Sequence, residues 1–398
     1  MKRRTLLASL AVASSAGCLR LQSTDGGTPT EAGATSGEQT AAPPDATATD
    51  ATATDAPATD EPATTEAPTA AESDRLDLRW RSGLRSDELV VGGATLYAFP
   101  GDNGVHAVDP ETGATRWSAA TDATLRGAAV GGDAVFAADR MSEGSLYAVD
   151  VDERATRWSA EIGGTARPPA RASEEFALVA AWNEDEGSRL TAFDRETGEE
   201  HWTWEHDRSI GEPSPVVDDT IYVTTTGTPT IHAIDVQTGR EQWVLEQSAA
   251  FPIIVTDGSL YCAWTSRIAE VSLQDRSQKW QVRVDDTIPY PPVLADGRLF
   301  AGVDGGGVVA LDVRRSEEVW RADVPFDEDS ALAVGPDAVW VATASELHAV
   351  DRDSAGAELV GSLGTSGTHP RTSEALFHDG TLVLCRGGSP MEAYDVVG

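Results

Sequence analysis

A segment of about forty residues recurs along this chain, and its pattern predicts an all-β fold, a single eight-bladed β-propeller. Clear copies are VHAVDPETGATRW at 105–117 and IHAIDVQTGREQW at 231–243, and the tryptophan position returns at intervals of 37 to 44 residues. Asp-Gly pairs between apolar runs, as in DGRLFA at 296–301, predict tight hairpins inside each unit. The third observation is that each end of the repeat region carries part of one unit.

Each unit reads as four strands. An inner strand precedes the Asp-Gly turn and a second strand follows it. A third strand carries the pattern h-x-A-h-D, where h is apolar, and an outer strand begins at the tryptophan. The Thr-Gly of the D-x-x-T-G turn between the last two strands is intact at Gly113, Gly198 and Gly239. Other residues replace it elsewhere, so we expect this turn to tolerate them.

The two ends of the repeat region complete one another. Residues 391–395 form an eighth h-x-A-h-D strand without the outer strand that should follow it. Residues 76–80, LDLRW, form an outer strand without the three strands that should precede it. We therefore expect the N-terminal strand to close the last blade, which removes the open sheet edges that invite aggregation.

The repeat signature A-x-D-x-x-T-G-x-x-x-W resembles the tryptophan-docking motif of the PQQ-like β-propeller repeat family over residues 76–398. The resemblance implies that the repeat tryptophan, alanine and glycine pack blade against blade, and it does not by itself imply bound PQQ. It assigns a structural role to seven of the eleven tryptophans: Trp80, Trp117, Trp158, Trp202, Trp243, Trp280 and Trp320.

The whole chain is also similar to the propeller lipoproteins of the bacterial outer-membrane protein assembly machinery, which are lipid-anchored rings without a cofactor. This resemblance implies a non-catalytic scaffold that binds protein partners at the cell surface, as a monomeric ring. We accordingly expect no catalytic residue, no metal and no cofactor.

Two other functions share the fold. A PQQ-dependent quinoprotein dehydrogenase is the main alternative, and members of that class carry adjacent cysteines under the quinone and a calcium-binding set. Here the three cysteines stand apart at 18, 262 and 385, and Asn183, Asp185 and Gly187 give only a fragment of a calcium loop. A small-ligand sensor domain is the second alternative.

The N-terminus reads as an export signal over residues 1–17. Basic Lys2, Arg3 and Arg4 precede an apolar run that is too short to span a bilayer. The Arg3-Arg4 pair resembles a twin-arginine signal, and Ser-Ala-Gly-Cys at 15–18 resembles a lipobox. We expect cleavage before Cys18 and a lipid on its thiol, which would anchor the protein to the outer face of the cell membrane.

Residues 18–74 read as a disordered linker ahead of the propeller at 75–398. Residues 21–74 hold no Lys, Arg or aromatic side chain, but they hold 13 Thr and 11 Asp or Glu. Such a segment has nothing apolar enough to bury. About fifty flexible residues span on the order of 40 Å, which would carry the propeller clear of a membrane.

The charge composition excludes several partner classes. Asp and Glu number 65 against 30 Lys and Arg, which gives a net charge of −35. A chain this acidic repels nucleic acid and anionic lipid, so we expect neither as a direct partner. Only Lys2 and Lys279 are lysines, and this lysine-poor, acidic composition is typical of halophiles. Molar salt shortens the Debye length to about 3 Å, so repulsion between the acidic side chains would destabilise the folded protein little.

Histidine and cysteine positions do not suggest a metal site. His106, His232 and His348 occupy one repeat position in blades 1, 4 and 7, which a ring keeps apart. Cys262 and Cys385 fall in the second strands of blades 5 and 8. We expect both thiols to be free and buried.

A partner is expected on the face that carries the loops between blades and the loops after each second strand. Arginine and aromatic side chains dominate protein-binding hot spots. The alternative is that these arginines neutralise nearby acids and the tryptophans fill the mouth of the ring. The candidate partner-binding residues, placed before inner strands or at the ends of second strands, are Arg126, Arg167, Arg171, Arg208, Arg371, Arg386, Trp182, Trp264, Phe251 and Tyr290.

Overall fold

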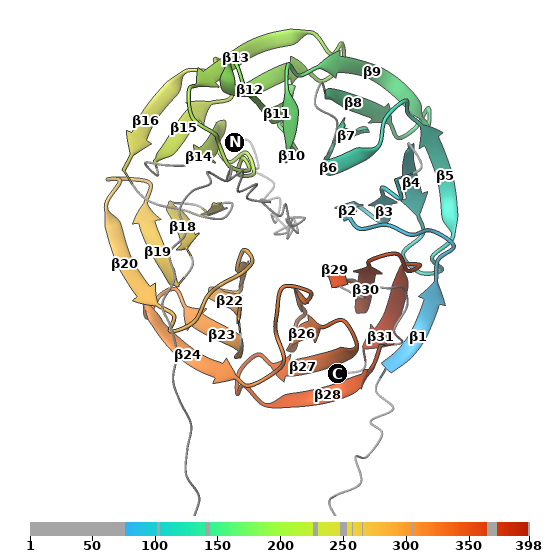
Figure 1. Cartoon of the computed structure of the whole chain (residues 1–398), viewed down its shortest axis with the longest axis vertical. Coiled ribbons are helices and arrows are strands. Elements are labelled where there is room, and N and C mark those ends of the chain that lie inside the picture. The colour runs from blue at the N-terminus through green and yellow to red at the C-terminus, as the bar shows by residue number, and fades with distance from the viewer. Residues whose placement is uncertain are drawn as a thin grey trace, which may run out of the picture. The chain divides into compact units, whose positions relative to one another are not determined.

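The computed structural model describes residues 76–396 apart from 102–103, 140–143, 226–229, 247–252, 257, 265, 305 and 364–371. In this part of the chain, 31 strands form eight antiparallel sheets that stand as blades around a ring (Figure 1). The predicted all-β, eight-bladed propeller is therefore confirmed. The predicted signal peptide, linker and Cys18 lie outside the described residues. Within them, no helix is long and apolar enough to cross a membrane.

Blades 1 to 4 follow one another along the chain, each running from the centre of the ring to its rim (Figure 1). Their strands are β2 (Leu89–Gly92), β3 (Thr95–Ala98), β4 (Gly104–Val108) and β5 (Thr115–Ala120); β6 (Leu125–Gly131), β7 (Ala134–Asp139), β8 (Ser145–Asp150) and β9 (Ala155–Glu161); β10 (Thr165–Ala172), β11 (Phe176–Asn183), β12 (Gly187–Asp194) and β13 (Glu200–His206); and β14 (Thr220–Thr224), β15 (Ile231–Asp235) and β16 (Glu241–Leu245).

Blades 5 to 8 complete the ring. Their strands are β17 (Ile254–Thr256), β18 (Ser259–Trp264), β19 (Arg267–Ser272) and β20 (Gln278–Arg283); β21 (Val293–Ala295), β22 (Arg298–Val303), β23 (Gly307–Asp312) and β24 (Glu317–Ala322); β25 (Ala331–Val334), β26 (Ala338–Ala342), β27 (Glu346–Asp351) and β28 (Ala357–Ser362); and β29 (Thr372–His378), β30 (Thr381–Arg386), β31 (Glu392–Val396) and β1 (Leu76–Arg81).

The hairpin between the first two strands of a blade has the backbone that the Asp-Gly pattern predicts. Asp296 and Gly297 both have positive φ, +48° and +77°, and Asp379 and Gly380 have +46° and +79°. Two consecutive positive φ angles define the type I′ turn, whose twist matches that of the flanking strands. Asp tolerates the left-handed region better than most side chains, which explains its place before the glycine.

Blade 4 departs from the predicted four strands. Its sheet holds β14, β15 and β16, and the residues ahead of β14 form only two isolated bridges, Ile210↔Thr225 and Val217↔Thr220. Pro213 and Pro215 lie between those bridges. Proline has no N–H to donate to a ladder, so the two prolines interrupt the inner strand of this blade.

The last blade closes as predicted, with β1 as its outer strand. β1 pairs with β31, from Leu76↔Val396 to Arg81↔Glu392. The Arg81 Nε–H donates to Glu392 Oε1 at 2.8 Å, a contact between residues 311 positions apart in sequence. This ladder joins the two ends of the repeat region in one sheet (Figure 1).

Tryptophan docking links neighbouring blades. Four indole N–H groups donate to a backbone carbonyl in the turn of the next blade, at 2.7–2.8 Å: Trp80 to Pro110, Trp158 to Arg195, Trp202 to Val236 and Trp320 to Arg352. A Cβ on Gly239 would lie 2.6 Å from the indole of Trp202, and Gly113 and Gly198 face Trp80 and Trp158 in the same way. The glycine of the repeat is therefore a contact surface for the indole.

The turn keeps its shape where glycine has been replaced. Arg154, Arg276, Ser316 and Ala355 hold the glycine position with φ between +58° and +62°. The tryptophans that precede the first three, Trp117, Trp243 and Trp280, make no bond to a turn carbonyl among the described residues, and Trp280 donates to Glu270 of its own blade. Larger side chains at this position thus keep the left-handed turn without the indole-to-carbonyl bond, and Arg276 instead places its guanidinium over the Trp243 ring, 5.4 Å from the ring centroid.

We predict that Gly239→Ala lowers the free energy of unfolding by about 2 kcal/mol or more, because the new Cβ meets both the positive φ and the Trp202 ring. Gly297→Ala is the matched control, since it has a positive φ and no atom within 4 Å of the added Cβ. The Gly297→Ala substitution should lower the free energy of unfolding by only about 1 kcal/mol. Equal losses in denaturant melts of the two variants would contradict a role for the indole contact.

Candidate functional site

Charged side chains gather on the inner strands of neighbouring blades, from blade 8 to blade 4. We call this set the inner arc; its members are Glu88, Arg126, Arg167, Arg171, Glu212, Glu374 and Arg386. The inner strands stand nearest the centre of the ring (Figure 1). Six of the seven lie ahead of an inner strand, near its start or at the end of a second strand, whereas Arg171 lies near the end of the inner strand β10.

Two carboxylates of the inner arc bind the backbone of the next blade. Glu88, just before β2, accepts hydrogen bonds from the N–H groups of Gly127 and Ala128 in β6, at 2.8 and 3.1 Å. Glu374 in β29 accepts the N–H of Leu89 at 2.7 Å. A carboxylate that accepts backbone N–H groups makes a charge-assisted bond, so these acids link blades 8, 1 and 2 at their inner edge.

The arginines of the arc are held in different ways. Arg171 is 6% exposed, and its Nε–H donates to the carbonyl of Pro213 at 2.9 Å. Arg167 donates from Nη2 to Ser209 Oγ at 3.3 Å, and Arg126 lies 3.7 Å from Asp87. Arg386 is 3% exposed and lies 3.5 Å from Glu392. Arg126 and Arg386 thus offset nearby acids.

Burial is the largest influence on the pKa of two acids in the arc, Glu88 and Glu212. Desolvation raises the pKa of Glu88, against the N–H groups of Gly127 and Ala128 and the charge of Arg126. Desolvation also raises the pKa of Glu212 to about 7, with Arg171 opposing and Glu88 reinforcing the shift. The same cause lowers the pKa of Arg171 to about 10. Perturbed groups of this kind concentrate at functional sites.

Four of the predicted partner residues belong to the inner arc: Arg126, Arg167, Arg171 and Arg386. Arg126 lies in β6, and Arg167 and Arg171 lie in β10, inside the inner strands and not ahead of them as predicted. β10 runs through Pro168 and Pro169, but its ladder with β11 skips from Arg167 to Arg171, because proline has no N–H to donate there. Phe251 and Arg371 lie outside the described residues.

The remaining predicted partner residues are placed along the same face. Trp182 and Trp264 lie at the ends of β11 and β18, and both are partly exposed. Tyr290 precedes β21 and donates its hydroxyl to the carbonyl of Glu328. Arg208 follows β13 and is exposed, whereas Arg386 ends β30 and is buried.

Sequence reasoning missed the three acids of the arc. Glu88 and Glu374 stand four residues before the last residue of β2 and β29, Gly92 and His378. That shared repeat position is a signal that the sequence carries. Glu212 does not share this offset, since it stands five residues before Val217, which pairs with Thr220 across the equivalent turn of blade 4.

The histidines predicted to lie apart and the two cysteines of the ring are placed in separate blades. His106, His232 and His348 lie in separate blades, in β4, β15 and β27, as predicted. His232 bonds to Glu241 and Thr230 at 2.7 and 2.8 Å. Cys262 and Cys385 are free and buried, also as predicted. Across the described ranges, no three His, Cys, Asp or Glu side chains are grouped to hold a metal ion.

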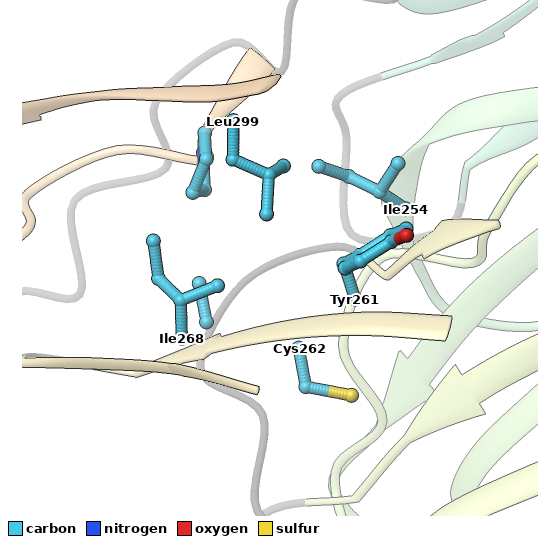
Figure 2. Close-up of a pocket in the computed structure, with 7 residues that line it drawn as sticks. Ile254, Tyr261, Cys262, Ile268 and Leu299 are labelled. Carbon is cyan, nitrogen blue, oxygen red and sulfur yellow. The ribbon is translucent and has the colours of Figure 1, made fainter. Parts of the chain in front are cut away.

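A space too narrow to hold a water molecule lies between blades 5 and 6, beside Tyr261, Cys262 and Leu299 (Figure 2). Its lining is mostly apolar, with Ile254 and Ile268 facing it. Burial raises the pKa of both Tyr261 and Cys262 to about 12, so both stay protonated at neutral pH. With no charged group converging on it, this space reads as imperfect packing between two blades and not as a binding site.

Comparisons with known proteins place the chain among propellers. Residues 69–182 and 186–356 match the family described as "Outer membrane protein assembly factor BamB". The crystal structure of BamB from Moraxella catarrhalis is similar at a TM-score of 0.65 and 16% identity, over 80% of this chain and 99% of that one. The quinohemoprotein alcohol dehydrogenase ADHIIG of Pseudomonas putida HK5 is similar at 0.63 and 12%, over 81% and 76%. At such identities the structural likeness shows the fold alone.

A curated relative also matches in part. The serine/threonine-protein kinase AfsK of Streptomyces coelicolor is 25% identical over 154 residues, which are 38% of this chain and 19% of the kinase. The match thus spans about a fifth of that relative.

We predict that Glu212→Gln raises the melting temperature at pH 8 by about 2 °C, with less effect at pH 5. The folded pKa, about 7, exceeds the unfolded value near 4.3, so the folded state binds more protons between them. The free energy of unfolding therefore falls as pH rises through this window, and the substitution removes that loss. Glu111→Gln, in the first D-x-x-T-G turn, is the control and should change neither melt. An equal change in melting temperature at both pH values would contradict a raised pKa of the Glu212 carboxyl.

Proposed function

The chain belongs to the family of the outer membrane protein assembly factor BamB, and from this premise we propose that it is a non-catalytic protein-interaction scaffold held at the outer face of the cell membrane. The observation that carries the proposal is the family match, which extends through most of the ring. The family is that of an assembly factor, a role that works through contacts and not through chemistry on a substrate.

The ring supports such a role physically. Its blades are fixed to each other by tryptophan docking and by the inner-arc carboxylates, so the loops of one face are carried on a rigid frame. Binding residues commonly lie on loops positioned by a rigid scaffold. Rigid loops also lose little conformational entropy when a partner binds.

We propose the inner-arc face as the partner surface. Arg126, Arg208, Trp182, Trp264 and Tyr290 keep part of their surface in solvent there. Arginine and aromatic residues supply most of the binding energy at protein interfaces. Arg171 and Arg386 are too deeply buried to be reached by a flat protein surface.

The proposed tether is the N-terminal segment. The basic start, the short apolar run and Cys18 support export followed by lipid attachment at the cysteine. The linker that follows would hold the ring away from the bilayer, where its acidic surface meets no repulsion from anionic lipid.

We predict that the protein sediments with membranes and that Cys18→Ser releases it into the medium. A single covalent lipid anchor is removed with the thiol, and the acidic ring has no other attraction to anionic lipid. Immunoblots of membrane and medium fractions measure the partition, and mass spectrometry of the mature N-terminus identifies the lipid. Wild-type protein found free in the medium would contradict the tether.

We further predict that cross-linking in the native salt joins partner proteins to the inner-arc face. Arg208→Glu combined with Trp182→Ala should remove these cross-links, because a charge reversal and a lost aromatic anchor each weaken an interface. Arg314→Glu, in the exposed turn on the opposite face, is the matched control and should keep them.

Two results would count against the proposal. Loss of the cross-links in Arg314→Glu alone would move the partner to the other face. Reduction of a redox dye by the wild-type protein, dependent on both added PQQ and Ca²⁺, would replace the scaffold with a quinoprotein dehydrogenase.

A further inference from the structure

Blade 5 differs from its neighbours in how its two junctions are held. In a docked junction, the tryptophan of one blade donates its indole N–H to a turn carbonyl of the next blade. Docked junctions join blades 8 and 1, 2 and 3, 3 and 4, and 6 and 7. Among the described residues, blade 3 is therefore docked on both sides and blade 5 on neither, whereas each of the other six blades is docked on one side.

A carboxylate withdraws the indole from the junction of blades 5 and 6. In the six other outer strands with a repeat tryptophan, an alanine lies opposite the tryptophan in the ladder. In blade 5 the residue opposite Trp280 is Glu270, and the indole N–H donates to Glu270 Oε2 at 2.5 Å. Lys279 Nζ donates to Oε1 of the same carboxylate at 2.6 Å. The donor that would reach the turn of blade 6 is thus satisfied inside blade 5.

A guanidinium takes the place of the turn glycine at the junction of blades 4 and 5. Arg276 holds that turn position with a φ of +61°, and its guanidinium carbon lies 5.4 Å from the centroid of the Trp243 ring. The indole N–H of Trp243 makes no bond to the described carbonyl of Leu273 in this turn. A cation over a ring fixes two groups less strictly than a hydrogen bond, whose distance and angle are both narrow.

The other two undocked junctions carry hydrogen bonds that the junctions of blade 5 lack. Glu88 accepts the N–H of Gly127 between blades 1 and 2, and the Thr372 hydroxyl donates to the Thr343 carbonyl between blades 7 and 8. In the described part of the chain, no hydrogen bond or ion pair joins strands β17 to β20 to the strands of blade 4 or blade 6. Blade 5 is therefore the blade with the fewest directional ties to its neighbours.

Apolar packing holds blade 5 in the ring. Leu260 and Cys262 share a buried cluster with Tyr222 of blade 4, and Tyr261 shares another with Leu299 of blade 6. The narrow space in Figure 2 lies within the second of these contacts. Apolar contact is not directional, so blade 5 can separate from its neighbours without breaking a specific bond of its strands.

We propose that blade 5 is a conformational element of the ring, which opens as a unit while the other blades stay closed. The connection that follows it remains on blade 6, because Asp286 pairs with Arg321 of β24 at 3.3 Å. Trp264, a candidate partner residue, ends β18 of this blade, so a partner that contacts it meets the adjustable part of an otherwise rigid frame. The inference does not depend on the scaffold role, because opening is measured on the isolated full chain.

Two buried cysteines report on the opening. Cys262 in β18 of blade 5 and Cys385 in β30 of blade 8 are both free and fully buried. A thiol reagent reaches such a side chain only when the surrounding strands separate. We expect Cys262 to be labelled at least tenfold faster than Cys385 in native salt, each rate being normalised to that of the denatured chain and each site identified by peptide mass spectrometry. Equal normalised rates would overturn the proposal.

Amide hydrogen exchange tests the whole blade. Blade 3 is the internal reference, since it is docked on both sides. We expect protection factors in the central strands of blade 5, β18 and β19, to be at least tenfold lower than in the central strands of blade 3, β11 and β12. Equal protection in the two blades would show that the ring opens only as a whole, against the proposal.

Restoring the repeat pattern should close the blade. Glu270→Ala combined with Ser316→Gly returns the alanine and the turn glycine to the junction of blades 5 and 6. Trp280 can then donate to the carbonyl of Val313, the position that accepts the indole in docked junctions. This variant should label Cys262 at least threefold more slowly than wild type.

Two further variants complete the test. Ala355→Gly is the matched control, because it changes the same turn position in blade 7, where Trp320 is already docked, and it should leave the labelling of Cys262 unchanged. Arg276→Gly restores the glycine facing Trp243, so it repeats the test at the other junction should the double variant fail to fold. Unchanged labelling of Cys262 in the restored variants would overturn the proposal and leave the scaffold role untouched.

Discussion

The packing of one tryptophan on the turn of the next blade is the contact on which the ring depends. A blade is a small twisted sheet that buries its faces only against its two neighbours. The indole of Trp202 fills this junction and donates to Val236, and the bare Cα of Gly239 lets the ring approach. The described residues show this indole-to-carbonyl contact at four junctions, where it fixes the angle between blades, and core clusters drawn from adjacent blades fill the space between them.

At the centre of the ring a second kind of contact replaces the indole. Inner strands have a free edge, and carboxylates of one blade bind the amides of the next, as Glu88 does with Gly127. These acids are partly buried in a low-dielectric environment. An unpaired charge is costly there, and a hydrogen bond to a charged group is stronger than in water. Arg171 lies at the same inner edge, and its Nε–H donates to the carbonyl of Pro213 in the next blade.

The repeats made the fold predictable, whereas the site depended on contacts between repeats. The period, the Asp-Gly turns and the split last blade determine strand order and closure, and each is a local pattern. The irregular inner strand of blade 4 was not anticipated, although Pro213 and Pro215 explain it. Arg171 was selected as one arginine of several, but its proximity to Glu88 and Glu212 comes from three different blades. No spacing along the chain encodes that distance.

Closure by β1 also sets the order in which the molecule can be completed. Arg81 and Glu392 meet across 311 residues, so β1 emerges long before the strand that accepts it. At synthesis rates of about 5–20 residues per second, β1 waits roughly 15–60 s with an unpaired edge. The intervening blades can dock pairwise during that time, since their contacts are sequential. Circularisation is then a late, slow event of very high contact order, and the charged side chains of β1, Asp77, Arg79 and Arg81, would discourage its capture by other chains in the meantime.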